Sequence, residues 1–346
     1  MGTGRRAAFA SAALLVAAFA GAGTAQAQQM FSPDGWRNKP LADDAPLDPL
    51  SATMAAAVRL EFQTQMANPD VTKRPVVNTY WCTPRVYTVP AGQPTVQVTI
   101  TGPSKLDPNL LRQFAAVPIP PDAEPDENCS DHNMVVYQPS TDSLWEFFLA
   151  KKDGAGQWFT DFGGKIGPDD PGMLGVSQNP GHWMDKPAGY GRYGASASSI
   201  AMMSGLQRTS ELQAGAIDHV VSFAMNKPKA CFRYPAQRQD GHASQQASPL
   251  APPMGSILRL PASLDVDALA APAYTKMLAR AVQRYGMVLQ DRSSKVAFYA
   301  EHPKPGAPDP YGAIFAPANE SDVLRTFPWD KLQVLAAPPG TNACQM

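Results

Sequence analysis

The sharpest candidate for acid–base chemistry in this chain is a carboxylate inside an apolar run. Glu146 is the only charged residue of the run Leu-Trp-Glu-Phe-Phe, which extends from Leu144 to Phe148. In a strand, alternation places Leu144, Glu146 and Phe148 on one face and Trp145 on the other. Apolar surroundings raise the pKa of a carboxyl group, as a general acid requires. Glu146 is therefore predicted to be a catalytic acid, with a partly buried glutamate paired to a basic residue as the alternative.

His132 shares a face with Glu146 in only one of two possible hairpin registers. Residues 138–142 have the composition of a turn, which predicts a β-hairpin. A five-residue loop would pair Met134 with Glu146 and place His132 on the Glu146 face. A six-residue loop would pair Val135 with Glu146, and His132 would then point to the opposite face. The sequence leaves both registers open.

A second candidate pair, Asp218-His219, follows a predicted helix stop and begins a strand. Adjacent strand residues point to opposite faces, so these two cannot both serve one cleft from a regular strand. Asp218 is a candidate partner for Glu146. His219 is either a catalytic base or a structural histidine bonded to a backbone carbonyl. Together with Asp131-His132 the pair lacks the helical spacing of a metal motif, so we expect no metal and no cofactor.

Glycine, aromatic and arginine residues interleave in residues 181–199. Flat rings and guanidinium groups suit sugar recognition, because they stack on rings and donate paired hydrogen bonds. The predicted substrate-binding residues are Trp145, Trp158, Trp183, Arg192 and Tyr193. The run around Ser196 lacks the second glycine of the G-x-S-x-G motif, so a serine hydrolase is not indicated.

Two further aspartates, Asp291 and Asp240, are not predicted to be catalytic. Asp291 follows an apolar run and is interpreted as the structural turn of a hairpin leading into residues 296–301. Asp240 lies in a polar, proline-containing stretch and is a loop-tip candidate for closing a cleft.

Short strands separated by turn residues dominate the elements that must position these groups. The predicted strands are 76–82, 86–89, 95–100, 134–137, 144–150, 157–162, 217–225, 256–260, 286–290 and 296–301. The predicted helices are 48–66, 209–214, 272–285 and 321–327. This pattern predicts a mainly β fold, a β-sandwich or jelly-roll-like structure with a few appended helices.

The composition excludes some classes of protein. Proline numbers 35 of 346 residues, about twice the usual share, which argues against long helices. Lys and Arg number 29 against 30 Asp and Glu, with no basic cluster, so nucleic acid is not an expected partner.

The N-terminus has the pattern of a signal peptide. Two arginines precede an apolar run, and Ala25-Gln-Ala27 matches a cleavage site, which predicts a signal peptide over residues 1–27. Residues 28–47 are predicted to be an extended leader and 48–346 a single β-rich domain with an N-terminal helix. We expect a periplasmic or extracellular monomer without membrane contact after cleavage.

Export determines how the four cysteines are interpreted. None of them lies in a C-x-x-C pair, which argues against zinc and thioredoxin-like sites. An even number in an oxidising compartment favours two disulfides, for which three connectivities exist. The favoured pairs are Cys82–Cys129 and Cys231–Cys344, because each then closes one half of the chain.

Several runs occur in an order that resembles a group of secreted bacterial proteins common in actinobacteria and proteobacteria. The runs are Leu144-Trp-Glu-Phe-Phe, Trp158 with Gly163-Gly164, Tyr193-Gly-Ala-Ser-Ala-Ser, Gly215-Ala-Ile-Asp-His219 and Gln283-Arg-Tyr-Gly286. The resemblance extends from about Tyr80 to Leu335 and implies one integral domain, but it carries over no activity or catalytic residue. More loosely, the expected architecture is similar to that of β-sandwich enzymes that degrade polysaccharides.

These observations predict an exported enzyme that cleaves glycosidic bonds in a polysaccharide or oligosaccharide. A glycoside hydrolase with Glu146 as acid and Asp218 as partner is favoured, because hydrolysis uses two carboxyl groups. One alternative is a polysaccharide lyase in which His132, His219 or Tyr193 removes a proton and Arg192 neutralises a uronate. The other is a non-catalytic carbohydrate-binding protein.

Overall fold

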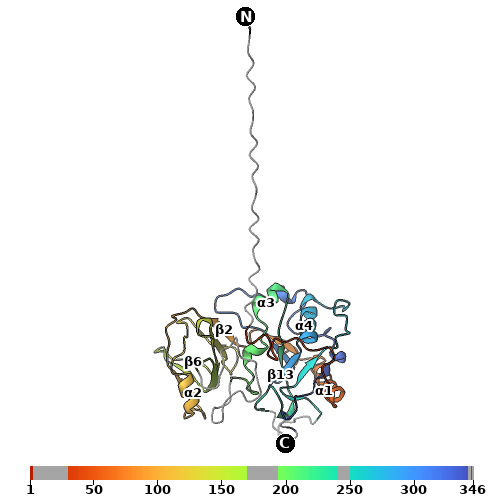
Figure 1. Cartoon of the computed structure of the whole chain (residues 1–346), viewed down its shortest axis with the longest axis horizontal. Coiled ribbons are helices and arrows are strands. Elements are labelled where there is room, and N and C mark those ends of the chain that lie inside the picture. The colour runs from red at the N-terminus through yellow and green to blue at the C-terminus, as the bar shows by residue number, and fades with distance from the viewer. Residues whose placement is uncertain (3–29, 170–193, 241–249, 342–343, 345–346) are drawn as a thin grey trace.

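The computed structural model describes residues 1–2, 30–169, 194–240, 250–341 and 344. The predicted signal peptide and the predicted binding residues Trp183, Arg192 and Tyr193 lie outside the described residues. Two lobes stand side by side in Figure 1. The small lobe comprises residues 83–169 and the large lobe the remaining described residues from position 30 onward.

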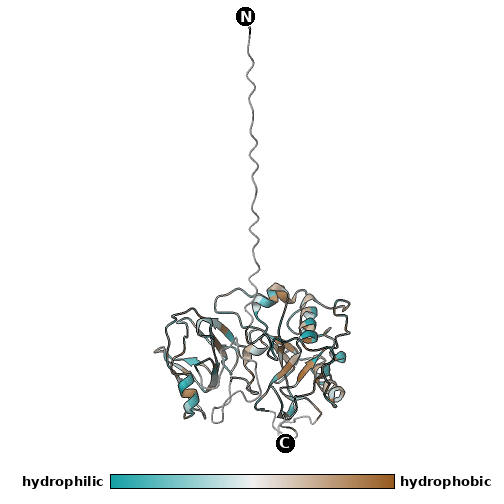
Figure 2. Cartoon of the chain, in the orientation of Figure 1, coloured by the Kyte–Doolittle hydropathy of each residue, from teal (hydrophilic) through white to brown (hydrophobic). Residues whose placement is uncertain are grey.

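A mixed six-stranded sheet forms the centre of the large lobe. Its strands lie in the order β1 (Val76–Asn78), β14 (Ala297–Tyr299), β9 (Val221–Met225), β13 (Met287–Arg292), β12 (Ile257–Arg259) and β15 (Gln333–Val334). Every residue of β9 is buried, as expected for a central strand covered on both faces. Figure 2 shows hydrophobic colours gathered on the strands of this lobe.

The longer helices pack against this sheet through apolar stripes. In α1 (Ser51–Met66), Val58 and Phe62 lie on the buried face, and the Phe62 ring stacks on that of Trp329 with centroids 4.2 Å apart. Helix α4 (Ala273–Arg284) ends before Gly286, whose φ of +87° favours glycine. The shorter helices α3 (Thr209–Ala214) and α5 (Tyr311–Phe315) complete the lobe.

The small lobe contains two sheets and one helix. The four-stranded sheet has the order β2 (Arg85–Thr88), β4 (Met134–Gln138), β5 (Ser143–Phe148) and β8 (Phe162–Ile166). The three-stranded sheet has the order β3 (Val98–Ile100), β7 (Trp158–Thr160) and β6 (Lys151–Lys152), and α2 spans Pro108–Gln113. An apolar core that includes Trp145, Phe147 and Trp158 packs between these elements.

A third apolar cluster joins the lobes. One face of the four-stranded sheet, including Val135 and Leu144, packs against Ala201, Met203 and Leu206. These last three residues belong to residues 194–207, which we call the junction segment. This cluster gives the two lobes a shared apolar core. The prediction of a single domain stays a prediction.

Both favoured disulfides are confirmed. Cys82 is bonded to Cys129, and Cys231 in β10 (Lys229–Phe232) is bonded to Cys344. Strand β10 pairs with β11 (Pro253–Met254).

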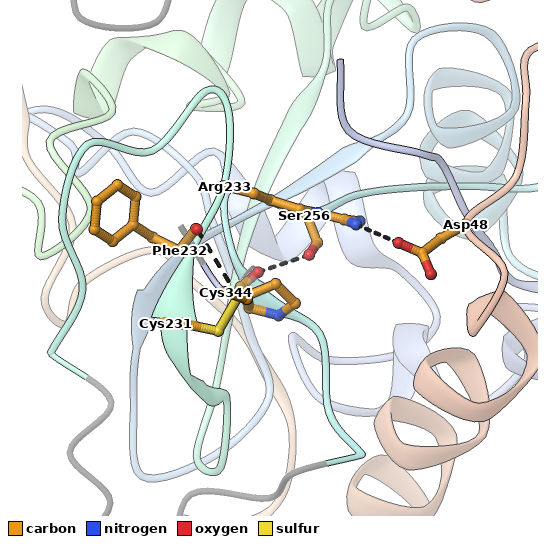
Figure 3. The surroundings of a disulfide bond; sticks show 7 residues. Asp48, Cys231, Phe232, Arg233, Ser256 and Cys344 are labelled. Carbon is orange, nitrogen blue, oxygen red and sulfur yellow. Dashed lines mark hydrogen bonds and ion pairs between the residues drawn. A yellow bond between two sulfur atoms is a disulfide. The ribbon is translucent and has the colours of Figure 1, made fainter. Parts of the chain in front are cut away.

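A buried ion pair lies beside the second disulfide. Arg233, the residue after β10, points towards the start of α1 and forms a 2.7 Å ion pair with Asp48 (Figure 3). Its guanidinium also donates to the Leu335 carbonyl at 3.0 Å. The neighbourhood of the Cys231–Cys344 disulfide therefore connects segments that are far apart in the sequence.

The prediction of a mainly β fold is confirmed, because the described residues contain fifteen strands in several sheets and few helices. A sandwich or jelly roll is not confirmed. Strands β1 and β14, β9 and β13, and β2 and β4 pair in parallel, whereas the jelly roll is an antiparallel architecture.

The two disulfides fit a protein of an oxidising compartment. None of the helices in the described ranges is long and apolar enough to cross a membrane.

Candidate active site

The hairpin register places Glu146 towards the large lobe. Val135 pairs with Glu146, which is the second of the two alternative registers, and pairing continues to Gln138 and Ser143, so only residues 139–142 form the loop. Glu146 therefore shares its face with Val135, which packs towards the junction segment. His132 lies just before β4 and has a φ of +43°. Its Nδ1 atom forms a 2.8 Å hydrogen bond with the Asp126 carbonyl.

Glu146 is completely buried and holds the junction segment in place. Its carboxylate accepts hydrogen bonds from the backbone N–H of Ala195 at 3.3 Å and of Met203 at 3.2 Å. Burial raises the pKa of Glu146 to about 7, against the opposing effects of these N–H groups and of Arg37. With no exposed surface, Glu146 serves here as an anchor, and the structure does not support its predicted contact with a substrate.

The structural role of Glu146 predicts a particular pH dependence of stability. Its folded-state pKa lies above the unfolded value, so its contribution to stability is lost as the pH rises from about 4.5 to about 7. Between pH 5 and pH 8, we expect the free energy of unfolding to fall by about 2–3 kcal/mol more in the wild type than in Glu146→Gln. Urea denaturation of both proteins at the two pH values measures this difference. Equal pH dependence, or loss of turnover in a stably folded Glu146→Gln variant, would contradict the anchoring role.

The structure separates the other predicted catalytic residues. Asp218 is exposed and lies near the Tyr285 hydroxyl, at 3.5 Å. His219 is bonded to Glu211 at 3.1 Å and to the Val220 carbonyl at 2.6 Å. The Glu211 charge raises the pKa of His219 in spite of its burial, and His219 in turn helps to lower the pKa of Glu211 to about 2. The structural interpretation of His219 therefore fits better than a base facing a cleft.

Two predicted stacking residues belong to the core. Trp145 is 4% exposed, and its indole N–H donates to the Gln113 carbonyl at 2.9 Å. Trp158 is 2% exposed. Since neither ring is presented to solvent, the structure does not support substrate binding by Trp145 or Trp158.

A pocket of about 210 Å³ lies where the two lobes meet, and we call it the junction pocket. The small lobe contributes Asp131 and Asn133, on the side of the sheet that faces the junction segment. The large lobe contributes Gln290, Asp291 and Tyr299 from the neighbourhood of β13 and β14. Residues from two distant parts of the chain thus line one polar cavity.

Burial and neighbouring charges raise the pKa values of the two carboxyl groups that line the junction pocket. Burial raises the pKa of Asp291 to about 7, and the charges of Asp240 and Asp131 add to this effect. Asp291 accepts hydrogen bonds from the backbone N–H of Ala197 at 3.4 Å and from its neighbour Arg292 at 2.8 Å. Burial, followed by the charge of Asp126, also raises the pKa of Asp131.

The same carboxylates act on the hydroxyl group of Tyr299. Burial and the charges of Asp291, Asp131 and Asp240 raise its pKa well above the usual value. Tyr299 therefore stays a neutral phenol, which can donate a hydrogen bond but is a poor base.

A β-bulge presents these groups to the pocket. Strand β13 pairs with β9 through Leu289 opposite Phe223 and Asp291 opposite Ala224. Gln290 therefore has no partner residue in β9 and forms the bulge. The Gln290 side chain is 4% exposed, and its Oε1 has no hydrogen-bond partner. A buried unpaired acceptor in the wall of a polar pocket is a group that a bound ligand can satisfy.

The rim of the junction pocket carries an exposed aromatic residue. Trp81 is 59% exposed and lines the junction pocket. A neighbouring groove of about 830 Å³ shares Asn78, Trp81 and Lys295 with it and adds Tyr80. The exposed Trp81 ring therefore lies between the polar junction pocket and this groove.

The prediction that Asp291 lies in a hairpin turn is wrong, because β9 lies between β13 and β14 in the sheet. Asp291 is instead a residue of strand β13 beside a bulge, and its side chain lines the junction pocket. The apolar run before Asp291 is the sequence pattern that indicates a buried strand at this position.

Two groups of side chains in the described ranges have the composition of a metal site. One is Cys82, Cys129 and Asp131, but both sulfur atoms are used in the disulfide. The other is Asp126, Glu127 and His302.

Comparison of the chain with protein-family models, with curated proteins and with solved structures found no match to any of them. The function is therefore inferred from the geometry of the site.

Proposed function

We propose that the protein is an exported glycoside hydrolase whose active site is the junction pocket. The observation that carries this proposal is that two carboxyl groups with raised pKa values, Asp131 and Asp291, line one pocket with an exposed tryptophan at its rim. Glycosidic bonds are cleaved by such a pair, one carboxylic acid protonating the leaving oxygen while a carboxylate acts on the other side of the sugar. This chemistry depends on the two carboxyl groups and can occur on folds other than a β-sandwich.

The pKa values of Asp291 and Asp131 suggest a different catalytic role for each. With a pKa of about 7, Asp291 keeps its proton at neutral pH often enough to act as the general acid. Asp131 is the partner carboxylate, acting as base or nucleophile. Tyr299 and Gln290 supply a hydrogen-bond donor and an acceptor for the hydroxyl groups of the bound sugar.

The two alternatives receive less support. A lyase needs a base, but His219 is bonded to Glu211 and His132 to the Asp126 carbonyl, while the third candidate, Tyr193, lies outside the described residues. A non-catalytic sugar-binding protein needs no carboxyl groups with raised pKa values. Incubating the purified protein with a panel of polysaccharides, while following reducing ends and the absorbance of unsaturated products together, distinguishes the three. New reducing ends without unsaturated products support the hydrolase, and binding without either product overturns it.

The exposed ring of Trp81 predicts an effect on substrate binding. Trp81→Ala is expected to raise KM about ten-fold, a loss of about 1.4 kcal/mol, with little change in kcat, because the ring stacks on a sugar away from the scissile bond. Steady-state kinetics on the best substrate of the panel measure this change. Trp81→Phe keeps a stacking face and is the matched control, with a KM close to that of the wild type. An unchanged KM in Trp81→Ala would remove Trp81 from the site.

A further inference from the structure

A cluster of charged side chains joins the lobes beside the Cys82–Cys129 disulfide. Asp126 and Glu127 precede β4 in the small lobe, and His302 follows β14 in the large lobe. One ligand atom from each of the three lies within 4.8 Å of the others. Asp126 and His302 are 0% and 2% exposed, whereas Glu127 is exposed.

The hydrogen bonds of His302 determine which ring nitrogen carries the proton. Nδ1 lies 2.8 Å from the Pro303 carbonyl oxygen, an acceptor, so Nδ1 is the donor. Nε2 lies 3.3 Å from the Asn128 side-chain nitrogen, a donor, so Nε2 offers its lone pair. A histidine that donates one N–H to a backbone carbonyl and presents the other nitrogen unprotonated has the arrangement of a metal ligand.

The Nε2 atom of His302, which accepts from Asn128, also lies near a carboxylate. It is 3.6 Å from Asp126 Oδ1, which accepts from the Asn128 backbone N–H at 2.9 Å. The other oxygen of this carboxylate, the buried Asp126 Oδ2, has no hydrogen-bond partner. Two ligands of one tetrahedral Zn²⁺, at about 2.1 Å each, lie about 3.4 Å apart. The separation of the two acceptors therefore suits a cation between them better than a charge-assisted hydrogen bond, which is about 2.8 Å long.

The surrounding charges also favour a divalent cation. Arg85 pairs with Glu127 at 2.5 Å and with Glu124 at 3.7 Å. The carboxyl groups of Asp126, Glu124 and Glu127 outnumber the single guanidinium of Arg85, so a bound cation would have more acidic than basic neighbours.

We propose that Asp126, Glu127 and His302 form a Zn²⁺ site that fastens the small lobe to the large one behind the junction pocket. The mixed nitrogen and oxygen donors suit Zn²⁺, whereas Ca²⁺ and Mg²⁺ prefer oxygen ligands alone. The sequence predicted no metal because these ligands are far apart in the chain and match no spacing motif. The argument for Zn²⁺ binding uses none of the residues to which the proposed glycosidase activity assigns a role.

Calorimetric titration of the untagged, chelator-treated full-length protein with Zn²⁺ tests the proposal. We expect one Zn²⁺ per chain, a higher melting temperature with Zn²⁺, and no competition from a hundred-fold excess of Ca²⁺ or Mg²⁺. His302→Gln is expected to abolish binding, and Glu127→Gln to weaken it at least about ten-fold.

Glu124→Gln is the matched control for Glu127→Gln. Both glutamates are largely exposed and pair with Arg85, but only Glu127 belongs to the cluster, so Glu124→Gln should weaken binding much less than Glu127→Gln. Absence of stoichiometric Zn²⁺ binding overturns the proposal and leaves a His302–Asp126 ion pair. Equal losses in the two glutamate variants overturn it as well. Because both variants change surface residues, this comparison holds even if His302→Gln fails to fold.

Discussion

Replacing Asp291 by Asn is expected to lower kcat by roughly 10²–10⁴-fold on a polysaccharide substrate, the usual contribution of a general acid. Asn has nearly the same shape and keeps an acceptor for the Ala197 N–H, but it carries no proton to give to the leaving oxygen. Substrate affinity should change little, since Trp81 and Tyr299 remain in place. Turnover and KM, measured on the substrate found in the panel, give the two effects separately.

The pH profile of the wild type tests the same residue. A general acid must be protonated, so activity should fall as the pH rises through about 7, where Asp291 loses its proton. Activity should fall again towards low pH as Asp131 becomes protonated, which produces a bell-shaped profile. The alkaline limb should disappear in Asp291→Asn.

Two controls separate catalysis by Asp291 from a role in folding. The folded-state pKa of Asp291 lies above the unfolded value, so its contribution to stability is lost between about pH 4 and pH 7. Asp291→Asn should therefore unfold at pH 8 at a temperature no lower than the wild type. Asp218→Asn, which changes an exposed carboxylate away from the junction pocket, should leave kcat unchanged. A fully active Asp291→Asn would exclude Asp291 as the acid, and an inactive Asp218→Asn would point to a different site.

Removal of the Cys231–Cys344 disulfide is expected to have the largest effect on stability. The bond closes 113 residues, and the Cys231→Ser/Cys344→Ser variant should lose about 4–5 kcal/mol of unfolding free energy through the added freedom of the unfolded chain. The bond lies beside the buried Arg233–Asp48 ion pair, as Figure 3 shows, so local loosening would also expose that pair to water. Guanidinium denaturation under non-reducing conditions measures the loss.

The Cys82–Cys129 disulfide supplies an internal comparison. Because it closes only 47 residues, Cys82→Ser/Cys129→Ser should lose slightly less, about 4 kcal/mol on the same entropic argument. A loss below about 1 kcal/mol for the Cys231–Cys344 variant would show that other contacts already restrain the C-terminal end of the chain.

Local structure could be predicted from the sequence where nearby residues determine it. The helix predicted at 209–214 is α3, and the one predicted at 272–285 is α4, which spans Ala273–Arg284. The segment predicted as a helix at 321–327 contains only a 3₁₀ turn, Asp322–Leu324, and the short helices α2 and α5 were not predicted. Short segments such as α2 have weak periodicity, so packing determines their conformation.

The candidate site could be predicted only in part. Sequence reasoning identified Glu146 as a buried carboxylate with a raised pKa, and its burial and pKa are as predicted. It could not show that the backbone N–H groups of Ala195 and Met203 enclose that carboxylate, because those residues are about fifty positions away. An isolated carboxylate in an apolar run has the same sequence pattern whether it anchors a segment or faces a substrate.

The sequence by itself determined the β-rich character, the longer helices and the number of disulfides, because these depend on periodicity, turn residues and the number of cysteines. Tertiary structure alone decided the hairpin register, the insertion of β9 between β13 and β14, and the meeting of Asp131 with Asp291. The physical reason is that strand pairing and burial depend on contacts between distant segments. The pKa of a carboxyl group depends on the surroundings that those contacts create.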